Sequence, residues 1–259
     1  MNQWIQLWKK ECLEMWRNFK WIWMPLVFII LGLTEPLSTY YMPVIMESVG
    51  GLPEGAVFEM PMPSPGEVLM MTTSQFNMLG ILVIVFASMG LISSERRSGV
   101  AGLILVRPVP HASYVTAKWA GMIVLGWLSL FLGYLASWYY TNLLFGSLSF
   151  GVMLNSFLLY GLWFTFIITL TVFFNALSKI SGLVAFATLT SVIGLSITTS
   201  VLEQWMTWSP AMALDLVGTM AMEGRLDTSF ALVLVVTLVS VIALLAAASF
   251  VLKNKEMAS

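Results

Sequence analysis

Few residues that carry redox, metal or charge-relay chemistry occur in this sequence of 259 residues. One cysteine cannot close an internal disulfide, and one histidine with one cysteine falls short of the three or four ligands of a usual metal site. Charged residues make up 10% of the chain and hydrophobic residues 59%. Because soluble domains normally carry about 25% charged residues, we expect an integral membrane protein without a metal site.

Six stretches are long and apolar enough to cross a bilayer. A hydrocarbon core about 30 Å thick needs roughly 20 helical residues for each crossing, because every backbone amide must be satisfied within the segment. The predicted spans are 21–44, 69–92, 119–140, 152–174, 181–201 and 229–252. The short alternating strands of a membrane barrel are missing from the pattern. We therefore predict an all-α polytopic membrane protein, with a single transmembrane domain over 21–259.

The first 20 residues predict a different kind of helix. Their apolar residues recur at helical spacing along one face, with polar residues largely opposite. The apolar face consists of Trp4, Trp8, Cys12, Met15, Trp16 and Phe19. Glu11 and Glu14 interrupt the segment, so we do not expect a cleavable signal. The pattern predicts an amphipathic helix over 1–20 lying in the membrane interface; a peripheral helix of a soluble subdomain is the alternative.

The basic residues predict the orientation of the spans. With the N-terminus in the cytoplasm, every Lys and Arg except Arg225 falls on the cytoplasmic side, as the positive-inside rule requires. Both termini are then cytoplasmic. The first outer loop would be 45–68, rich in Pro and Gly. The last, 202–228, is too apolar for a solvated loop and predicts a re-entrant segment; a seventh span is the alternative.

Ionisable groups are almost missing from the predicted spans. Only Glu35 lies within one, beside Pro36, where it could face a wet cavity or reach the outer headgroups. This scarcity weighs against a proton- or sodium-coupled transporter. The sole histidine, His111, falls in a predicted cytoplasmic loop, which weighs against an intramembrane protease. We expect no catalytic residues, and without a Gly-x-x-x-x-Gly-Lys-Ser/Thr loop, any ATPase would be a separate chain.

The cytoplasmic loop 93–118 reads "SSERRSGVAGLILVRPVPHASYVTAK". A seven-residue apolar run, flanked by Arg96, Arg97 and Arg107 and stopped by Pro108, predicts one or two helical turns at the membrane surface. Such a short helical segment could rest on the membrane or in a groove on another protein. The arginines could equally be anchors of topology.

This segment resembles the region between the second and third helices of bacterial type 2 ATP-binding-cassette (ABC) permeases, a six-helix family. The matching positions are Glu95, Gly99, Leu103, Leu105, Arg107, Pro108, Tyr114 and Lys118. Val100 departs from the pattern, since Thr or Ser is common there. The rest of the chain is also similar: an N-terminal connecting helix, six spans, a second cytoplasmic contact at 175–182 and an outer re-entrant segment before the last span.

The resemblance implies a permease subunit of an exporter in the bacterial cytoplasmic membrane. It would pair with a second permease, as a homodimer, and dock two copies of a cytoplasmic ABC ATPase. ATP and Mg would bind to that ATPase, so this chain would hold no cofactor. Its cargo would be an amphipathic or hydrophobic compound, peptide or lipid, and nucleic acid is not expected as a partner. The alternative is a non-transporting membrane regulator or scaffold that binds a cytoplasmic partner.

Two sets of candidate residues follow from the resemblance. The residues expected to couple the permease to the ATPase are Glu95, Arg96, Arg97, Gly99, Leu103, Arg107 and Lys179. The residues expected to line a central cavity are Glu35, Phe76, Met78, Phe86, Met89, Ser191, Ser196, Thr198 and Thr199. Met and Phe make adaptable surfaces for apolar cargo, although such residues more often pack or face lipid.

Overall fold

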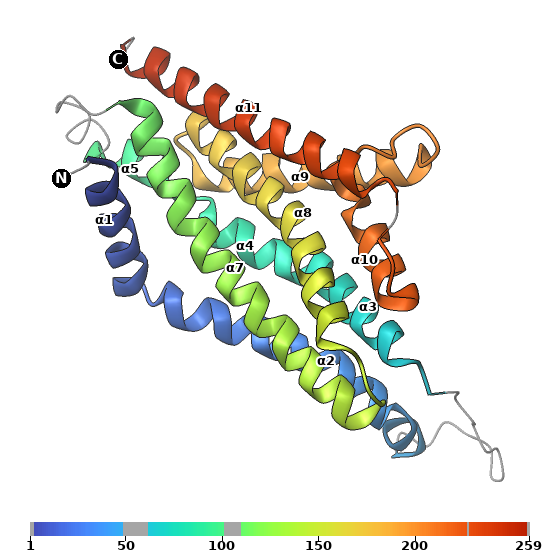
Figure 1. The fold of residues 1–259 in the computed structure, drawn as a ribbon. Helices are drawn as coiled ribbons and strands as arrows, with labels where there is room; N and C mark the ends of the chain where they lie inside the picture. Colours follow the sequence, from blue (N-terminus) through green and yellow to red (C-terminus); the bar gives the residue numbers. More distant parts are fainter. Residues whose placement is uncertain (1–2, 49–61, 101–109, 227, 258–259) are drawn as a thin grey trace.

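A computed structural model describes residues 3–48, 62–100, 110–226 and 228–257. Every regular element in these ranges is a helix (Figure 1). Most of the predicted loop 45–68, and the apolar run with Leu103 and Arg107, lie outside the described residues. The fold class predicted from the sequence is confirmed.

Within the described ranges, six stretches of helix are long and apolar enough to cross a membrane. An N-terminal helix, α1 (Gln3–Arg17), precedes them. The first span is α2 (Lys20–Ser48), and the second combines α3 (Pro65–Gln75), a π-helical turn (Phe76–Gly80), α4 (Ile81–Ser88) and α5 (Ser93–Arg97). The remaining spans are α7 (His111–Leu144), α8 (Phe150–Leu177), α9 (Ser181–Val201) and α11 (Phe230–Met257).

One boundary differs clearly from the prediction. The third span begins at His111, not at residue 119, so the last eight residues of the predicted loop 93–118 are helical. Pro110 directly precedes the helix, where the missing amide proton of proline costs nothing. The polar residues of this stretch do not stop the helix, because Tyr114 and Lys118 are buried with polar partners. A hydropathy criterion ends a span at such residues and therefore placed the boundary too late.

A cluster of aromatic rings lies in the core between α2, the π-helical turn, α7 and α8. Phe28 contacts the rings of Phe76 and Phe164, at 5.6 and 5.7 Å between centroids. The helices α2 and α7 approach closely because two glycines face each other: a Cβ on Gly32 would lie 2.2 Å from the carbonyl oxygen of Gly133. This crossing fixes the position of α2 against the rest of the bundle.

The segment before the last span folds back into the bundle. It contains a short 3-10 turn (Pro210–Met212) and α10 (Ala213–Glu223), which packs against α3 and α8. With 11 residues, α10 is too short to cross a bilayer. Gly66 allows the close approach, because a Cβ there would lie 2.3 Å from the carbonyl oxygen of Ala221. The predicted re-entrant segment therefore describes this region better than a seventh span.

Candidate functional site

Both chain termini, α1 and α5 lie at one end of the bundle, called here the termini side (Figure 1). The short helix α5 continues the second span beyond a break at residues 89–92. At the same end, Lys255 on α11 donates to the carbonyl oxygen of Leu177 at the end of α8, over 2.5 Å. This bond is one of several polar contacts that join helices at the termini side.

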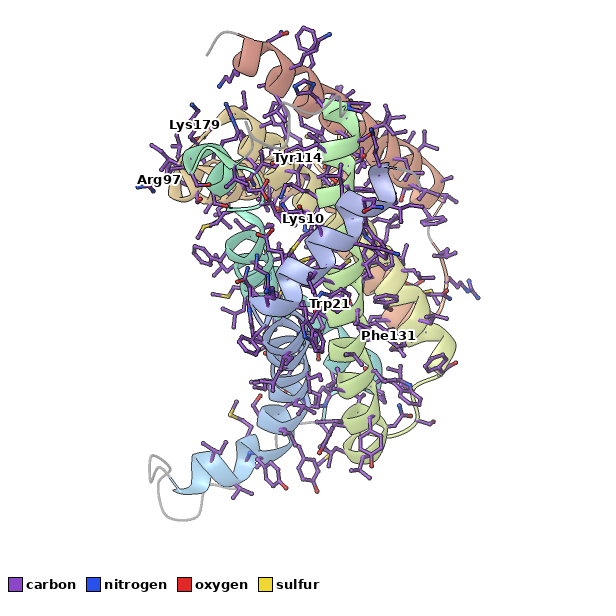
Figure 2. All side chains as sticks on the ribbon, turned by 90° about the vertical axis from the view of Figure 1, so that its left-hand side faces the viewer. Lys10, Trp21, Arg97, Tyr114, Phe131 and Lys179 are labelled. Carbon is purple, nitrogen blue, oxygen red and sulfur yellow. The ribbon has the colours of Figure 1, made fainter. Side chains whose placement is uncertain are left out.

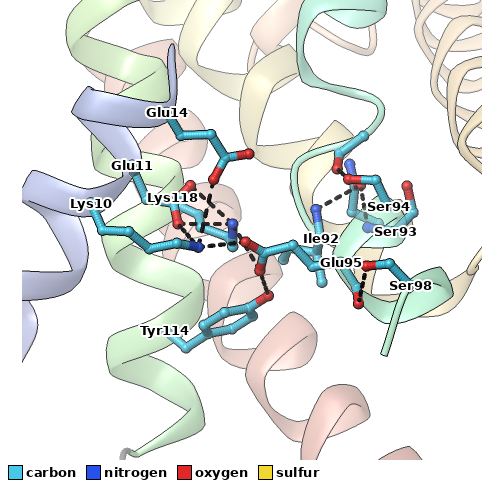
Figure 3. Close-up of polar contacts among 12 residues, drawn as sticks. Lys10, Glu11, Glu14, Ile92, Ser93, Ser94, Glu95, Ser98, Tyr114 and Lys118 are labelled. Atoms are coloured by element: carbon cyan, nitrogen blue, oxygen red, sulfur yellow. Dashed lines mark hydrogen bonds and ion pairs between the residues drawn. The ribbon is translucent and has the colours of Figure 1, made fainter. Parts of the chain in front are cut away.

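The first group of contacts is an ionic cluster of Lys10, Glu11, Glu95, Tyr114 and Lys118 (Figure 3). The Lys118 ammonium lies 2.9 Å from each carboxylate oxygen of Glu11 and 3.1 Å from Glu95. Lys10 lies 2.5 Å from Glu95 and 3.2 Å from Glu11. The Tyr114 hydroxyl donates a further hydrogen bond to Glu95. The cluster joins α1, α5 and α7.

The ionic cluster is buried except at Lys10, whose side chain is 40% exposed. Lys118 is 1% exposed, Glu11 3% and Glu95 7%. Two ammonium groups face two carboxylates, and Glu14 adds a third carboxylate at the rim, 3.6 Å from Lys10. Removing one member of such a group would leave an uncompensated buried charge, which is strongly unfavourable. The cluster therefore holds α1 in one position against α5 and α7.

The environment of Lys10 keeps its side chain charged. Burial would by itself lower the pKa of Lys10, but the hydrogen bond to Glu95 and the charges of Glu11 and Glu95 outweigh it and raise the pKa above its ordinary value. Carboxylate oxygens of Glu11, Glu14 and Glu95 lie within 4.8 Å of one another, a spacing that a metal ion could bridge. The two lysines already contact these three carboxylates and offset two of the three negative charges.

The second group of contacts centres on Asn175, near the end of α8. Its side-chain oxygen accepts hydrogen bonds from the backbone amides of Ile92 and Ser93, at 3.2 and 3.1 Å. Its side-chain amide donates to the carbonyl oxygens of Ser88 and Thr171, at 3.0 and 2.9 Å. Asn175 is fully buried and satisfies backbone groups that the break before α5 would otherwise leave unpaired.

Two further contacts attach α5 to the junction of α8 and α9. The Arg96 guanidinium donates to the carbonyl oxygen of Ala176 over 2.6 Å, and the hydroxyls of Ser93 and Ser181 lie 2.9 Å apart. We call the ionic cluster, the Asn175 contacts and these two bonds the α5 anchor. Through the α5 anchor, a segment of five residues is fixed to four other helices.

The predicted coupling residues divide into two groups in the structure. Glu95 and Arg96 are buried members of the α5 anchor. Arg97, Gly99 and Lys179 are exposed, and the side chains of Arg97 and Lys179 project at the same edge of the termini side (Figure 2). Gly99 has a φ of +79°, a backbone conformation that favours glycine, and has open space around it.

The predicted cavity residues occupy several different environments. Phe76 is fully buried in the core, where it packs against Phe28 and Tyr134, so its expected place in a cavity lining is wrong. Its large apolar ring fills the space between α2 and α7. Met78 and Phe86 are 73% and 54% exposed on the surface of the bundle. Met89 is partly buried against the core.

The predicted polar seam on α9 is similarly dispersed. Ser191 and Thr198 donate to carbonyl oxygens of their own helix, Ala187 and Gly194. Thr199 is buried and lies 2.7 Å from the Ser209 hydroxyl, and Ser196 lines a hollow beside it. Glu35 lines a separate cavity on the side opposite the termini. Sequence spacing alone could not separate these environments.

Seven residues whose side chains form the α5 anchor were not among the predicted site residues: Lys10, Glu11, Ser93, Tyr114, Lys118, Asn175 and Ser181. One signal in the sequence points to Glu11, which shares a helical face with Trp8 and Met15 and therefore places a carboxylate on an apolar face. Tyr114 and Lys118 match the permease pattern, but nothing in the sequence predicts their contacts with Glu95 and Glu11.

Comparison with known proteins agrees with the membrane-spanning helical fold. A family model described as "ABC-2 family transporter protein" matches residues 5–206. A relative from Bacillus subtilis (strain 168), named "Uncharacterized transmembrane protein YxlG", is 38% identical over 211 residues, which cover 82% of this chain and 82% of the relative. The matched region includes every residue of the α5 anchor.

Proposed function

Because the chain belongs to the ABC-2 transporter family, we propose that it is the permease subunit of an ABC exporter driven by a separate cytoplasmic ATPase. Family membership confirms the resemblance seen in the sequence and supports a role as a membrane permease subunit. Members of this family are membrane components of transporters and are not themselves catalytic. The six apolar helices make the chain a multi-pass membrane protein.

The termini side faces the cytoplasm in this proposal. The distribution of Lys and Arg supports that orientation, since Arg225 alone lies on the other side of the predicted spans. The membrane would be the bacterial cytoplasmic membrane. The ATPase would bring ATP and Mg, and its docking surface would include the exposed residues Arg97, Gly99 and Lys179.

The α5 anchor is the observation that carries the proposal. A force applied just beyond α5 would reach α1 and α7 through the ionic cluster, and α8 and α9 through Asn175, Arg96 and Ser93. Packed and hydrogen-bonded elements move together as rigid units, so α5 would not shift by itself. Helix α5 carries the exposed charge of Arg97 and is bonded to four other helices. It is therefore suited to transfer motion from an ATPase to the membrane helices.

A second permease and membrane lipid would cover the remaining apolar surface. Phe186 and Ile193 on α9, and Val239 and Ile242 on α11, are more than half exposed. We propose a homodimer of permeases with two ATPase copies, moving an amphipathic or hydrophobic compound, peptide or lipid.

Copurification tests this proposal. The permease is expressed with an ABC ATPase subunit from the same organism, as wild type, as Arg97→Glu and as Arg225→Glu. Each variant reverses one exposed arginine, on the termini side or on the opposite side. We expect the ATPase to copurify with the wild type and with Arg225→Glu, and to be lost with Arg97→Glu. If no variant retains the ATPase, or all retain it equally, the scaffold alternative is favoured.

A further inference from the structure

A cavity of about 310 Å³ lies on the side opposite the termini. It is lined by the last turns of α2, by residues that lead into α3, by Met71 on α3 and by Phe145 at the end of α7. We call it the Glu35 pocket. None of the contacts of the α5 anchor reaches it, so it is a separate site.

The pocket exists because α2 and α7 separate after a close crossing. The two helices touch at Gly32 and Gly133, where a side chain on either glycine would meet the backbone of the other helix. Pro36 and Pro43 lie inside α2 beyond this crossing, and each removes a hydrogen bond from the helix. Figure 2 shows the last turns of α2 leaning away from α7. The space between them is the pocket.

Glu35 places an uncompensated carboxylate in this space. It is half-buried, and among the described residues no Lys, Arg or His forms an ion pair with it and no donor forms a hydrogen bond with its side chain. In contrast, Glu11 and Glu95 at the other end of the bundle are paired with lysines. A carboxylate within the apolar part of a membrane protein is costly and is normally retained for use.

The other walls of the Glu35 pocket suit a cation that carries apolar groups. Tyr40 and Phe145 stand edge to face with ring centroids 6.2 Å apart, and ring faces attract cations. Met42 and Met71 add flexible, polarizable side chains that adapt to varied apolar shapes. Pockets of this kind, with apolar walls and one charged group, fix the orientation of a small ligand through the charge.

We propose that the Glu35 pocket binds an amphipathic organic cation, such as a quaternary ammonium or phosphonium compound, with its charged centre against Glu35. The rings of Tyr40 and Phe145 contact the same charged centre, and the methionines contact the apolar groups. As a cargo site, this deepens the proposed transport function and rests on it. Binding itself does not require the ATPase.

The test is calorimetric titration of the purified full-length permease, without ATPase or nucleotide, with tetraphenylphosphonium. A separate titration uses tetraphenylborate, which has nearly the same shape and the opposite charge. Two variants remove one carboxylate each: Glu35→Gln in the pocket, and Glu203→Gln, an exposed acid beside the hollow at α9 and α10. A third variant, Tyr40→Leu, removes one ring.

We expect wild type to bind tetraphenylphosphonium and to bind tetraphenylborate at least about tenfold more weakly. Glu35→Gln should lose about tenfold or more in affinity for the cation, Tyr40→Leu should lose part of it, and Glu203→Gln should match wild type. Equal binding of the two ions, no binding of the cation, or equal affinities of Glu35→Gln and Glu203→Gln would overturn the proposal.

Two features keep this test decisive. If Glu35→Gln fails to fold, the comparison of the two ions on wild type still supports or overturns the proposal. Because the titration contains no ATPase, a negative result leaves the coupling function standing. Conversely, failure of the ATPase to copurify would leave a positive titration intact.

Discussion

The Lys118 ammonium on α7 lies 2.9 Å from both carboxylate oxygens of Glu11 on α1, and both side chains are almost fully buried. This pair attaches the N-terminal helix to the third span. Glu95 on α5 joins the same two helices, through Lys118 and Lys10. The N-terminal helix is therefore part of the folded bundle as well as an amphipathic helix.

Lys118→Met should destabilise the protein by about 3–5 kcal/mol, because it leaves Glu11 and Glu95 buried with one ammonium group fewer. Lys253→Met is the matched control, since Lys253 is exposed on α11. Thermal unfolding in detergent measures the effect. The double variant Lys118→Met with Glu11→Gln should recover part of the loss, because it removes the unpaired charge. A melting temperature of Lys118→Met equal to that of the Lys253→Met control would show that the pair is not a structural attachment.

Cys12 offers a direct measure of whether α1 is attached. Burial, and then the charge of Glu11, raise the pKa of the Cys12 thiol, so less of it is thiolate at neutral pH. We expect slow reaction of Cys12 with N-ethylmaleimide in wild type and fast reaction in Lys118→Met, followed by mass spectrometry. Since Cys12 is the single cysteine, the label reports on α1 alone. Equally slow labelling of both proteins would contradict the role given to Lys118.

Asn175→Leu should also destabilise the protein, because the buried backbone amides of Ile92 and Ser93 lose their hydrogen-bond acceptor. Each buried group left unsatisfied costs about 1–3 kcal/mol. The control is Asn155→Leu, the same substitution at a half-buried position on the same helix, where the side chain forms no hydrogen bond with the described residues. Thermal unfolding should separate the two variants clearly, and similar melting temperatures would argue against the Asn175 contacts.

Gly32→Ala should disturb the crossing of α2 and α7, because its Cβ would lie 2.2 Å from the carbonyl oxygen of Gly133. Backbone must move to relieve this contact, so we expect a loss of about 1–3 kcal/mol. Gly151→Ala is the control, since its Cβ would meet Ser149 at an ordinary 3.6 Å. Unfolding of both variants is compared with wild type. If the Gly32→Ala variant unfolded at the same temperature as wild type, the crossing of α2 and α7 would tolerate a wider spacing.

Hydropathy and charge predict much of this fold. The fifth span was predicted at 181–201, and α9 covers Ser181–Val201, since apolar residues fill the helix and the charged Lys179 precedes it. The start of the third span was missed because Tyr114 and Lys118 are polar but have buried partners. A polar residue marks the end of a membrane span only when its polar group has no partner inside the protein and must be hydrated.

The α5 anchor was less predictable. Lys118 and Glu11 are 107 positions apart, and Asn175 and Ile92 are 83 apart. Helical spacing relates neighbours along one helix but carries no information on which helices meet. The sequence did identify Glu95 and Arg96, but as contacts to a partner; the structure places both inside the protein, where they position α5.

The rate of ATP hydrolysis tests the central claim most directly. The ATPase of the copurification experiment is assayed alone, with wild-type permease in lipid nanodiscs, and with the Arg97→Glu and Arg225→Glu permeases. We expect wild type and Arg225→Glu to change the rate several-fold, and Arg97→Glu to leave it at the rate of the ATPase alone. An unchanged rate with wild type, or the same rate with all three permeases, would contradict coupling through the surface that the α5 anchor supports.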